Sequence, residues 1–469
     1  MRIFFFFVFT LFSCSNLKET NKFKNEIDSI NIITPPYNLL QKNISFKTTS
    51  ETSSFISYWI KNTNSVKHSD ASKRDLIHNF SLIFLRPQQE YQYLIHNSNE
   101  DSLAISDTLS FFTDKLPEYI PNFTLEKNDF EFDGLIFLRT PSKPGVQLLI
   151  DNRGRVVWFQ KSDDNLPRFY DFVPPDSYLS SYEPNVFYEI NFYGDTIYKI
   201  DTKDKSIHHE LTKDKNNNII GLSYAYKEFD LRPYGGRPRD VIKGDGIVVY
   251  DSLGNLIWEW NIFDHEDPIP YLKDNRMTLT LRDRRKLDSL KIKPRGIFNR
   301  DDIQMTRDDW SHGNAIGITQ DNNYIVSFRN FHQLWKIDSK SGNVIWKLGL
   351  NGNVKIDSDN YFYAQHAIHH VKGDTLLLFD NGHRDFRISS RALMFRMIDS
   401  EFSLIKSIYL PKELYTFKQG SVYLIENDKL LFSCSVKRKL VITNLEGKIL
   451  WQLAGEHAFY RANYIDNIK

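Results

Sequence analysis

The chain has 469 residues, of which 41% are hydrophobic and 25% charged, and its 35 Phe and 24 Tyr supply a large core, so a disordered chain is excluded. With 60 Lys and Arg against 59 Asp and Glu, the formal charge of +1 leaves no excess for a polyphosphate backbone, and we expect no nucleic-acid partner. The two cysteines, Cys14 and Cys434, exclude a disulfide framework and any Cys-rich metal site.

The first residues predict an export signal followed by a lipid anchor. Arg2 precedes the apolar run IFFFFVFTLF, which is too short to span a bilayer as a mature helix. The run ends in LFSC, which resembles a bacterial lipobox and implies cleavage before a lipidated Cys14. We therefore expect a signal peptide at 1–13, a polar tether at 14–35 and an extracytoplasmic lipoprotein held at a membrane, in the periplasm or at the outer membrane. An ordinary signal peptide with an incidental Cys is the alternative.

Residues 36–118 alternate short β-rich runs with polar turns. The runs ISFKTT, SFISYWI, NFSLIFL, YQYLIHN and TLSFFTD predict a small β-sandwich. Their order resembles a fibronectin type III module, in which Tyr91 and Tyr93 lie on the strand after a turn containing Pro87, and the last strand ends near Phe112.

From residue 119 to 469 one unit recurs: an apolar strand, an Asp or Asn, a Gly turn and a second strand that often ends in Trp. Six copies begin at Leu148, Phe187, Ile247, Leu334, Leu393 and Leu440, and the fifth lacks the turn Gly. Each copy predicts a β-hairpin, because Asp or Asn beside Gly supports the positive φ of a tight turn. A hairpin alone cannot bury its apolar face, so the six copies predict a six-bladed β-propeller over 119–469 and an all-β chain.

A charged segment at 276–291, RMTLTLRDRRKLDSLK, separates the third copy from the fourth. Charge runs usually face water, so we expect a solvated surface insertion. Its role in any function stays open.

Unusual polar residues fall outside the hairpins, on segments expected to surround the central channel. In DDWSHGNAIGI, His312 and Asn314 occupy alternate positions, so in an extended strand they would point to the same face. Arg329 lies in an apolar sequence, where a buried guanidinium needs an anion or several acceptors. Further polar residues of this kind are His209 in SIHHEL, His366 in FYAQHAIHH, and Asn381 and Arg391 in LLLFDNGHRDFRISSRALMF.

Three of these blocks carry a family resemblance. DWSHGNAIGI, SFRNFHQLWKIDSKSGNVIWKLG and AQHAIHHVKGDTLLLFDNGHRDFRISSRALMFRMID occur in this order and are similar to the bacterial arylsulfotransferases. The resemblance covers roughly residues 140–455. It implies a six-bladed propeller that moves a sulfuryl group from a phenolic sulfate donor to a phenolic acceptor, with no nucleotide donor and no cofactor.

The resemblance also implies roles for individual residues. His366 would be the nucleophile that becomes transiently sulfated, in a ping-pong reaction. His312, Asn314 and Arg329 would hold the sulfuryl oxygens, and His209 would complete the pocket, although His208 beside it makes this last assignment less specific.

Other assignments stay open. Asn381 and Arg391 are candidates for substrate binding, but Asn381 also fits a hairpin turn and Arg391 a structural ion pair. His369 and His370 are adjacent and would face opposite sides of a strand, so we expect no metal site there.

Two alternative functions need different chemistry. A non-catalytic propeller that serves as a scaffold or binding lipoprotein would need no cluster of His and Arg. A quinone-dependent dehydrogenase is favoured by repeats such as IDSKSGNVIWKLG. Such enzymes normally have eight Trp-docked blades, however, whereas here six copies occur and four of them end in Trp: Trp158, Trp258, Trp346 and Trp451.

Overall fold

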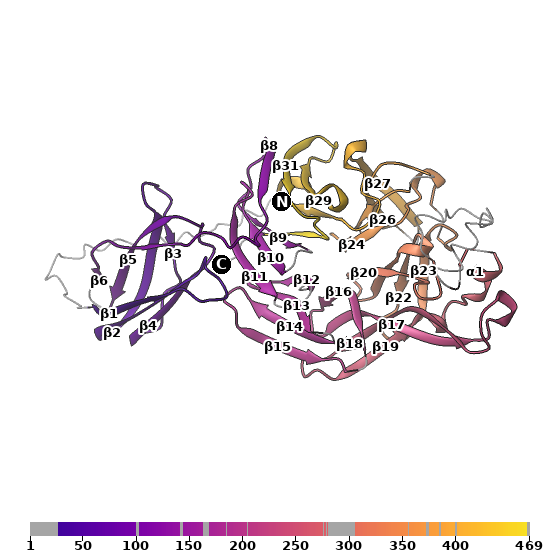
Figure 1. The fold of residues 1–469 in the computed structure, drawn as a ribbon, viewed down its shortest axis with the longest axis horizontal. Helices are drawn as coiled ribbons and strands as arrows, with labels where there is room; N and C mark the ends of the chain where they lie inside the picture. Colours follow the sequence, from indigo (N-terminus) through magenta and orange to yellow (C-terminus); the bar gives the residue numbers. More distant parts are fainter. Residues whose placement is uncertain are drawn as a thin grey trace, which may run out of the picture. The chain divides into compact units, whose positions relative to one another are not determined.

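A computed structural model describes residues 27–466, except 100–102, 141–143, 163–167, 184, 204, 275, 278, 280–304, 355, 372–374, 384–385 and 399–400. The predicted signal peptide, Cys14 and most of the predicted insertion at 276–291 lie outside the described residues. Within the described ranges, no helix is long and apolar enough to cross a membrane. The chain forms two compact units that meet in sequence between Lys115 and Leu116 (Figure 1).

The described residues of the N-terminal unit, 27–99 and 103–115, form seven strands. They are β1 (Ile27–Ile33), β2 (Lys42–Ile60), β3 (Lys67–His68), β4 (Asp75–Leu82), β5 (Glu90–Ser98), β6 (Leu103–Ile105) and β7 (Leu109–Phe112). The long strand β2 pairs with β1 and β4 through its first half and with β3 and β5 through its second half. Both sets of strands contribute to one hydrophobic cluster, as the two sheets of a β-sandwich do. The likeness to a fibronectin type III module stays a prediction.

One prediction for this unit is wrong. ISFKTT and SFISYWI are not two strands but parts of the single strand β2. The polar residues between them continue the strand, and the pairing of β2 with β4 shifts register between Lys47 and Thr52. This irregularity lets β2 pair with both sets of partner strands. The polar residues at its centre therefore do not form the turn that their composition predicts.

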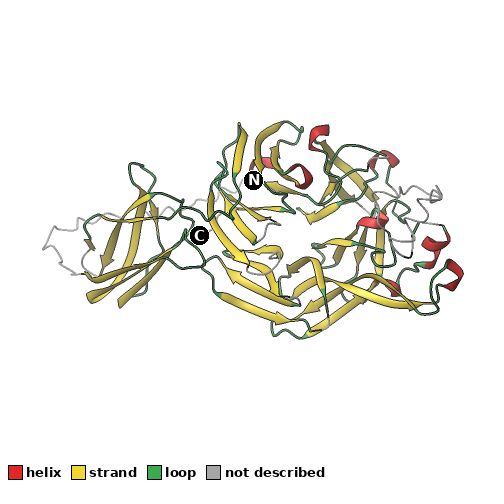
Figure 2. Cartoon of the chain, in the orientation of Figure 1, coloured by secondary structure: helices red, strands yellow, loops and turns green. Residues whose placement is uncertain are grey.

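The C-terminal unit is a six-bladed β-propeller, built almost wholly of strands (Figure 2). From the inside outward, blade 1 is β32 (Ala462–Ile465), β9 (Leu135–Thr140), β10 (Gly145–Ile150) and β11 (Val156–Ser162), and blade 2 is β12 (Arg168–Val173), β13 (Ser177–Glu183), β14 (Val186–Asn191) and β15 (Thr196–Asp201). Blade 3 is β16 (Ile207–Lys213), β17 (Ile219–Phe229), β18 (Asp240–Tyr250) and β19 (Leu256–Asn261), and blade 4 is β20 (Gly313–Ile318), β21 (Tyr324–Phe328), β22 (Gln333–Ile337) and β23 (Val344–Gly349). Blade 5 is β24 (His366–His370), β25 (Thr375–Asp380), β26 (Arg391–Ile398) and β27 (Glu401–Tyr409), and blade 6 is β28 (Ser421–Ile425), β29 (Lys429–Cys434), β30 (Lys439–Thr443), β31 (Ile449–Gly455) and β8 (Phe123–Asn128).

Short helical segments lie between the strands. They are α1 (Ile269–Lys273) and the 3-10 helices η1 (Arg232–Tyr234), η2 (Ile262–Asp264), η3 (Arg329–Phe331), η4 (Ser358–Asn360), η5 (Lys412–Leu414), η6 (Glu426–Asp428) and η7 (Ser435–Lys437). Of these, η3 matters for the site, because it follows directly on β21 and carries Arg329.

The prediction that each repeat is a hairpin is confirmed. The six copies form the outer strand pairs β10/β11, β14/β15, β18/β19, β22/β23, β26/β27 and β30/β31. All five predicted turn glycines have positive φ, for example +74° at Gly154 and +83° at Gly447. The Asp or Asn before each glycine also acts as predicted: the Asp151 carboxylate accepts backbone N–H bonds from Arg153 and Arg155.

The hydrophobic core lies between neighbouring blades. One cluster joins blades 3 and 4, another blades 4 and 5, and a third blades 5 and 6. Tryptophans at the hairpin ends reach the next blade: the indole N–H of Trp158 donates to the Phe192 carbonyl of blade 2, and that of Trp451 donates to the Asn152 carbonyl of blade 1. The ends of the propeller sequence are therefore joined.

Strand pairing closes the ring a second time. The innermost strand of blade 1 is β32, from the C-terminal end of the propeller, and it pairs with β9. The outermost strand of blade 6 is β8, from its N-terminal end, and it pairs with β31. The six inner strands contact one another in sequence around the axis, and β32 contacts β12.

Candidate active site

The predicted site residues gather where the inner strands begin. His209 is the third residue of β16, His312 directly precedes β20, and His366 is the first residue of β24. Arg461 directly precedes β32. Inner strands of consecutive blades run in the same direction around the axis, so their first residues meet at one end of the central channel.

Local irregularities aim these side chains. The pairing of the inner strand shifts register between Ile207 and Leu211 in blade 3, between Gly313 and Ala315 in blade 4, and between His366 and Ile368 in blade 5. Bulges of this kind redirect side chains and are common beside active sites.

The argument that placed His312 and Asn314 on one face of a strand is wrong. His312 lies outside β20 and has φ of +51°, so strand alternation does not apply to it. The Nδ2 atom of Asn314, which is fully buried, donates to the Gln365 carbonyl at 2.8 Å. One N–H of the Asn314 amide remains for a ligand.

His366 is held by both ring nitrogens. Its Nδ1 lies 2.8 Å from Asn381 Oδ1 and 3.0 Å from the Ala364 carbonyl oxygen. Both neighbours are acceptors, so Nδ1 carries the proton and Nε2 carries the lone pair. The backbone N–H of Gln419 donates to Nε2 at 3.2 Å.

Burial and positive charge keep this imidazole neutral. Desolvation holds the pKa of His366 well below its usual range, and the charge of Arg329 lowers it further, while the hydrogen bond with Asn381 acts in the opposite direction. A neutral ring with its lone pair on Nε2 is the form that acts as a nucleophile, once the Gln419 N–H has left that atom.

Asn381 therefore orients His366. Its Nδ2 atom donates to the Thr416 and Gln419 carbonyls, at 2.7 Å each, which leaves Oδ1 facing the ring. That Asn381 binds substrate stays a prediction.

Arg391 takes part in a buried ion pair, and its role as a substrate ligand stays a prediction. It is 2% exposed, and its Nε donates to Asp380 at 2.8 Å. Its other nitrogens bond the Tyr409 hydroxyl at 2.7 Å and the Tyr361 carbonyl at 2.9 Å. The alternative of an ion pair, left open by the sequence, is the one observed.

His209 and His312 lie together, with ring centroids 5.0 Å apart. Nδ1 of His312 is 2.8 Å from an Asp309 carboxylate oxygen, and Nδ1 of His209 is 2.7 Å from Nδ1 of His208. Desolvation holds the pKa of His209 well below its usual range. His209 is thus the histidine that faces the cluster, and His208 lies behind it.

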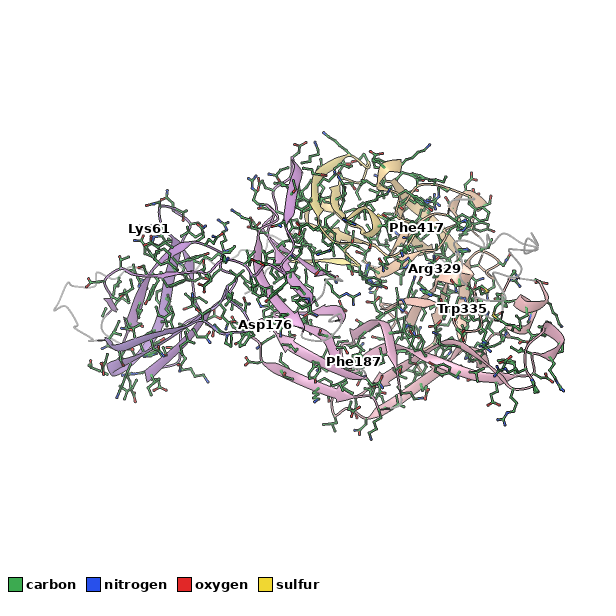
Figure 3. All side chains as sticks on the ribbon, in the orientation of Figure 1. Lys61, Asp176, Phe187, Arg329, Trp335 and Phe417 are labelled. Atoms are coloured by element: carbon green, nitrogen blue, oxygen red, sulfur yellow. The ribbon has the colours of Figure 1, made fainter. Side chains whose placement is uncertain are left out.

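Two guanidinium groups add positive charge. Arg329, labelled in Figure 3, is 8% exposed, and Arg461 is 7% exposed. Arg461 pairs with Glu210 and donates to the Asn314 carbonyl at 2.9 Å. The charges of both arginines act on His366, so the site favours an anionic substrate.

Sequence reasoning missed four groups. Asp309 and Asp245 hold histidines, and Gln419 and Arg461 enter from the last blade and the closing strand. Asp309 had a signal, since it lies three residues before His312. Among the described residues, no group of three His, Cys, Asp or Glu side chains is arranged to hold a metal ion.

Comparison with known proteins identifies the family. Residues 122–403 match the family model described as Arylsulfotransferase (ASST), which spans more than half of the chain. The chain belongs to the arylsulfotransferase family. No curated protein shows a significant match.

Several solved structures resemble this arylsulfotransferase-family chain weakly. A protein of unknown function from Bacteroides caccae is 12% identical, with a TM-score of 0.42, over 71% of this chain and 100% of that one. A streptogramin B lyase is 13% identical, with a TM-score of 0.38, over 72% and 88%. Virginiamycin B lyase from Staphylococcus aureus is 12% identical, with a TM-score of 0.35, over 71% and 88%. Likenesses this weak say nothing about the chemistry of this chain.

Proposed function

We propose that this arylsulfotransferase-family protein moves a sulfuryl group from a phenolic sulfate ester to a phenolic acceptor through a sulfated His366. The observation that carries the proposal is the environment of His366: a buried, neutral ring with its proton fixed on Nδ1 and its lone pair on Nε2, beside Arg329. No nucleotide donor is required, because the ester itself supplies the sulfuryl group.

In the first half-reaction, the Nε2 lone pair attacks sulfur and the bond between sulfur and the aryl oxygen breaks. The leaving phenolate takes a proton from a protonated His312, because the lowered pKa of His209 keeps that ring neutral. Nδ1 of His366 keeps its proton, which is shared with Asn381 Oδ1. Arg329, the remaining N–H of Asn314 and the Gln419 N–H, displaced from Nε2, donate to the sulfuryl oxygens, where negative charge is redistributed in the transition state.

In the second half-reaction, the acceptor phenol occupies the place of the first. Its hydroxyl proton passes back to the same histidine, its oxygen attacks sulfur, and the bond between sulfur and Nε2 breaks. Because the donor phenol leaves before the acceptor enters, we expect ping-pong kinetics.

The gathering of the predicted residues favours this reaction over a scaffold, which would need no such cluster. The propeller has six blades, whereas quinone-dependent dehydrogenases normally have eight, so the blade number does not favour that alternative. We also retain the proposal that the protein is an extracytoplasmic lipoprotein anchored through Cys14, on the strength of the lipobox-like LFSC. Mass spectrometry of Cys14 in protein purified from membranes tests this anchor.

The test of the reaction is a transfer assay with p-nitrophenyl sulfate as donor and phenol as acceptor. We expect release of nitrophenol that depends on phenol, and a sulfated peptide containing His366 when the acceptor is left out. His366→Ala should lose both, because the nucleophile is gone.

His370→Ala is the matched control. His370 ends the same strand, β24, and touches none of the site residues named above. It should keep transfer activity. Transfer retained by His366→Ala would remove His366 as nucleophile, and absence of transfer by the intact protein across a panel of aryl sulfates would favour the scaffold.

A further inference from the structure

A buried carboxylate that the proposed chemistry does not use lies behind the site. Asp245, on β18, is 3% exposed. Its Oδ2 accepts hydrogen bonds from the Ser311 hydroxyl and from the Gly313 N–H, the latter at 2.7 Å. Its Oδ1 lies 3.1 Å from Nε2 of His208. One carboxylate therefore reaches the neighbours of both His209 and His312.

We propose that Asp245 is a positioning residue for proton transfer: through His208 it fixes the tautomer of His209, and through Ser311 and Gly313 it fixes the turn that carries His312. This inference rests on the proposed sulfuryl transfer and decides which atoms of the two histidines face the phenol oxygen.

The contact between His208 and His209 relates the tautomers of the two rings. The Nδ1 atoms of His208 and His209 are 2.7 Å apart, so one of them donates and the other accepts. The Asp245 carboxylate favours a proton on the facing Nε2 of His208, and a neutral His208 then has its lone pair on Nδ1. His209 must donate from Nδ1, and its lone pair lies on Nε2.

The ring of His208 is held in place for this relay. It is 3% exposed and stacks on Tyr224, with ring centroids 4.0 Å apart. Desolvation opposes ionisation of Asp245, but the close approach of His208 and the hydrogen bonds from Ser311 and Gly313 outweigh it and lower the pKa of Asp245. The carboxylate thus stays charged at its place.

Asp245 also holds the backbone around His312. His312 has φ of +51°, a conformation that a residue with a side chain seldom adopts. The residues on either side of it, Ser311 and Gly313, both bond to Asp245. A Cβ at position 313 would lie 3.1 Å from the Asp245 carboxyl carbon, so only glycine allows this approach without a shift.

The contacts of Asp245 on both sides place His209 and His312 in the same orientation toward the site. Nδ1 of His209 is engaged by His208, and Nδ1 of His312 by Asp309. The Nε2 atoms of both rings are left for the phenol oxygen, which loses its proton as the acceptor attacks sulfur. A phenol has a pKa of about 10, as a Tyr side chain does, so it needs this base.

Asp245→Asn tests the proposal with little change of shape. The Gly313 N–H still needs an acceptor, so the new amide must turn its NH₂ group toward His208. That reverses the relay: His208 carries its proton on Nδ1, His209 accepts, and Nε2 of His209 carries a proton instead of a lone pair. A comparable Asp→Asn change in a Ser-His-Asp site lowers kcat by about 10⁴-fold through the wrong tautomer.

We expect ¹⁵N NMR of the intact protein to show a pyridine-type Nε2 on His209, and the variant to show a pyrrole-type Nε2. With phenol as acceptor, the kcat of the variant should fall by about 10²–10⁴-fold, and the donor KM should change by about twofold or less. The fall in kcat should be smaller when the acceptor is a more acidic phenol. If Asp245 had only a structural role, the substitution would change neither the tautomer of His209 nor the dependence of kcat on the acidity of the acceptor.

Glu189→Gln is the matched control. Glu189, on β14, is 4% exposed and pairs with Lys213 at 2.6 Å, away from the histidines. Its kcat should stay near that of the unaltered protein. The proposal is overturned by a pyrrole-type Nε2 on His209 in the unaltered protein, or by a folded Asp245→Asn that keeps its kcat with phenol. Should Asp245→Asn not fold, the NMR spectrum of the unaltered protein still decides the tautomer, and it does so even if no aryl sulfate is a substrate.

Discussion

Removing the side chain of Asn381 separates its two candidate roles, substrate ligand and support for His366. Asn381→Ala deletes three hydrogen bonds: one with His366 Nδ1 at 2.8 Å, and two at 2.7 Å with the carbonyls of Thr416 and Gln419. Asn381 is fully buried, so each carbonyl loses a partner that water does not readily replace. At about 1–3 kcal/mol for each of the two carbonyls, we expect a loss of about 2–6 kcal/mol of folding free energy.

The effect on catalysis should be smaller than complete loss. The Ala364 carbonyl remains 3.0 Å from Nδ1 of His366, so the proton stays on Nδ1. What disappears is one hydrogen bond to a ring that gains positive charge as Nε2 attacks, and such bonds contribute about 1.5–3 kcal/mol. We therefore expect kcat to fall by about 10- to 100-fold, with the donor KM unchanged.

The assay measures the nitrophenol burst in the absence of acceptor, which counts sulfated sites, and then steady-state turnover with phenol. Urea unfolding gives the change in stability. A raised donor KM with kcat intact would restore Asn381 as a substrate ligand and refute the positioning role. A loss of more than about 10⁴-fold in a folded variant would mean that the Ala364 carbonyl does not hold the tautomer.

Two further predictions concern the arginines. Arg329→Gln should lower kcat/KM for the donor by about 10²–10³-fold. The neutral form of His366 is the active one, and the charge of Arg329 lowers the pKa of His366, so the acid limb of the pH–rate profile should move to higher pH in this variant. Arg329→Lys should leave the acid limb in place but recover only part of the rate. Arg391→Leu should lower the free energy of unfolding, measured in urea, by about 3–5 kcal/mol, because the fully buried Asp380 loses a partner. The kcat per folded site should stay within about threefold of that of the unaltered protein. A large loss of kcat with unchanged stability would contradict the structural assignment.

Local patterns predicted the propeller well. The Asp or Asn beside Gly determines a turn over a few residues, so five of the six hairpins were visible from their turns, down to the positive φ of Gly154 and Gly447, and the fifth, which lacks the Gly, was visible from its strand pattern. The strand boundary inside β2 was not visible, because there a polar stretch continues a strand that two sets of partners share.

The site was predictable only in part. His366, His312 and Arg329 were found through ordered motifs, and the structure brings them to one end of the channel. The substrate-binding roles of Asn381 and Arg391 stay predictions, and the structure shows their side chains bonded to His366 and to Asp380, because composition does not tell whether a polar side chain faces the channel or a neighbouring chain segment. Gln419 and Arg461 were missed, because they lie far from His366 in sequence and come near it only when blade 6 and β32 have packed against blade 5 and blade 1.

That closure makes assembly and activity a single event. The same strand, β32, completes the innermost layer of blade 1 and follows directly on Arg461, so a chain that stops before β32 lacks part of the site. During folding, each earlier blade can pack against its neighbour while the channel still lacks a wall. If the proposed reaction is correct, a ring that has not closed should be inactive.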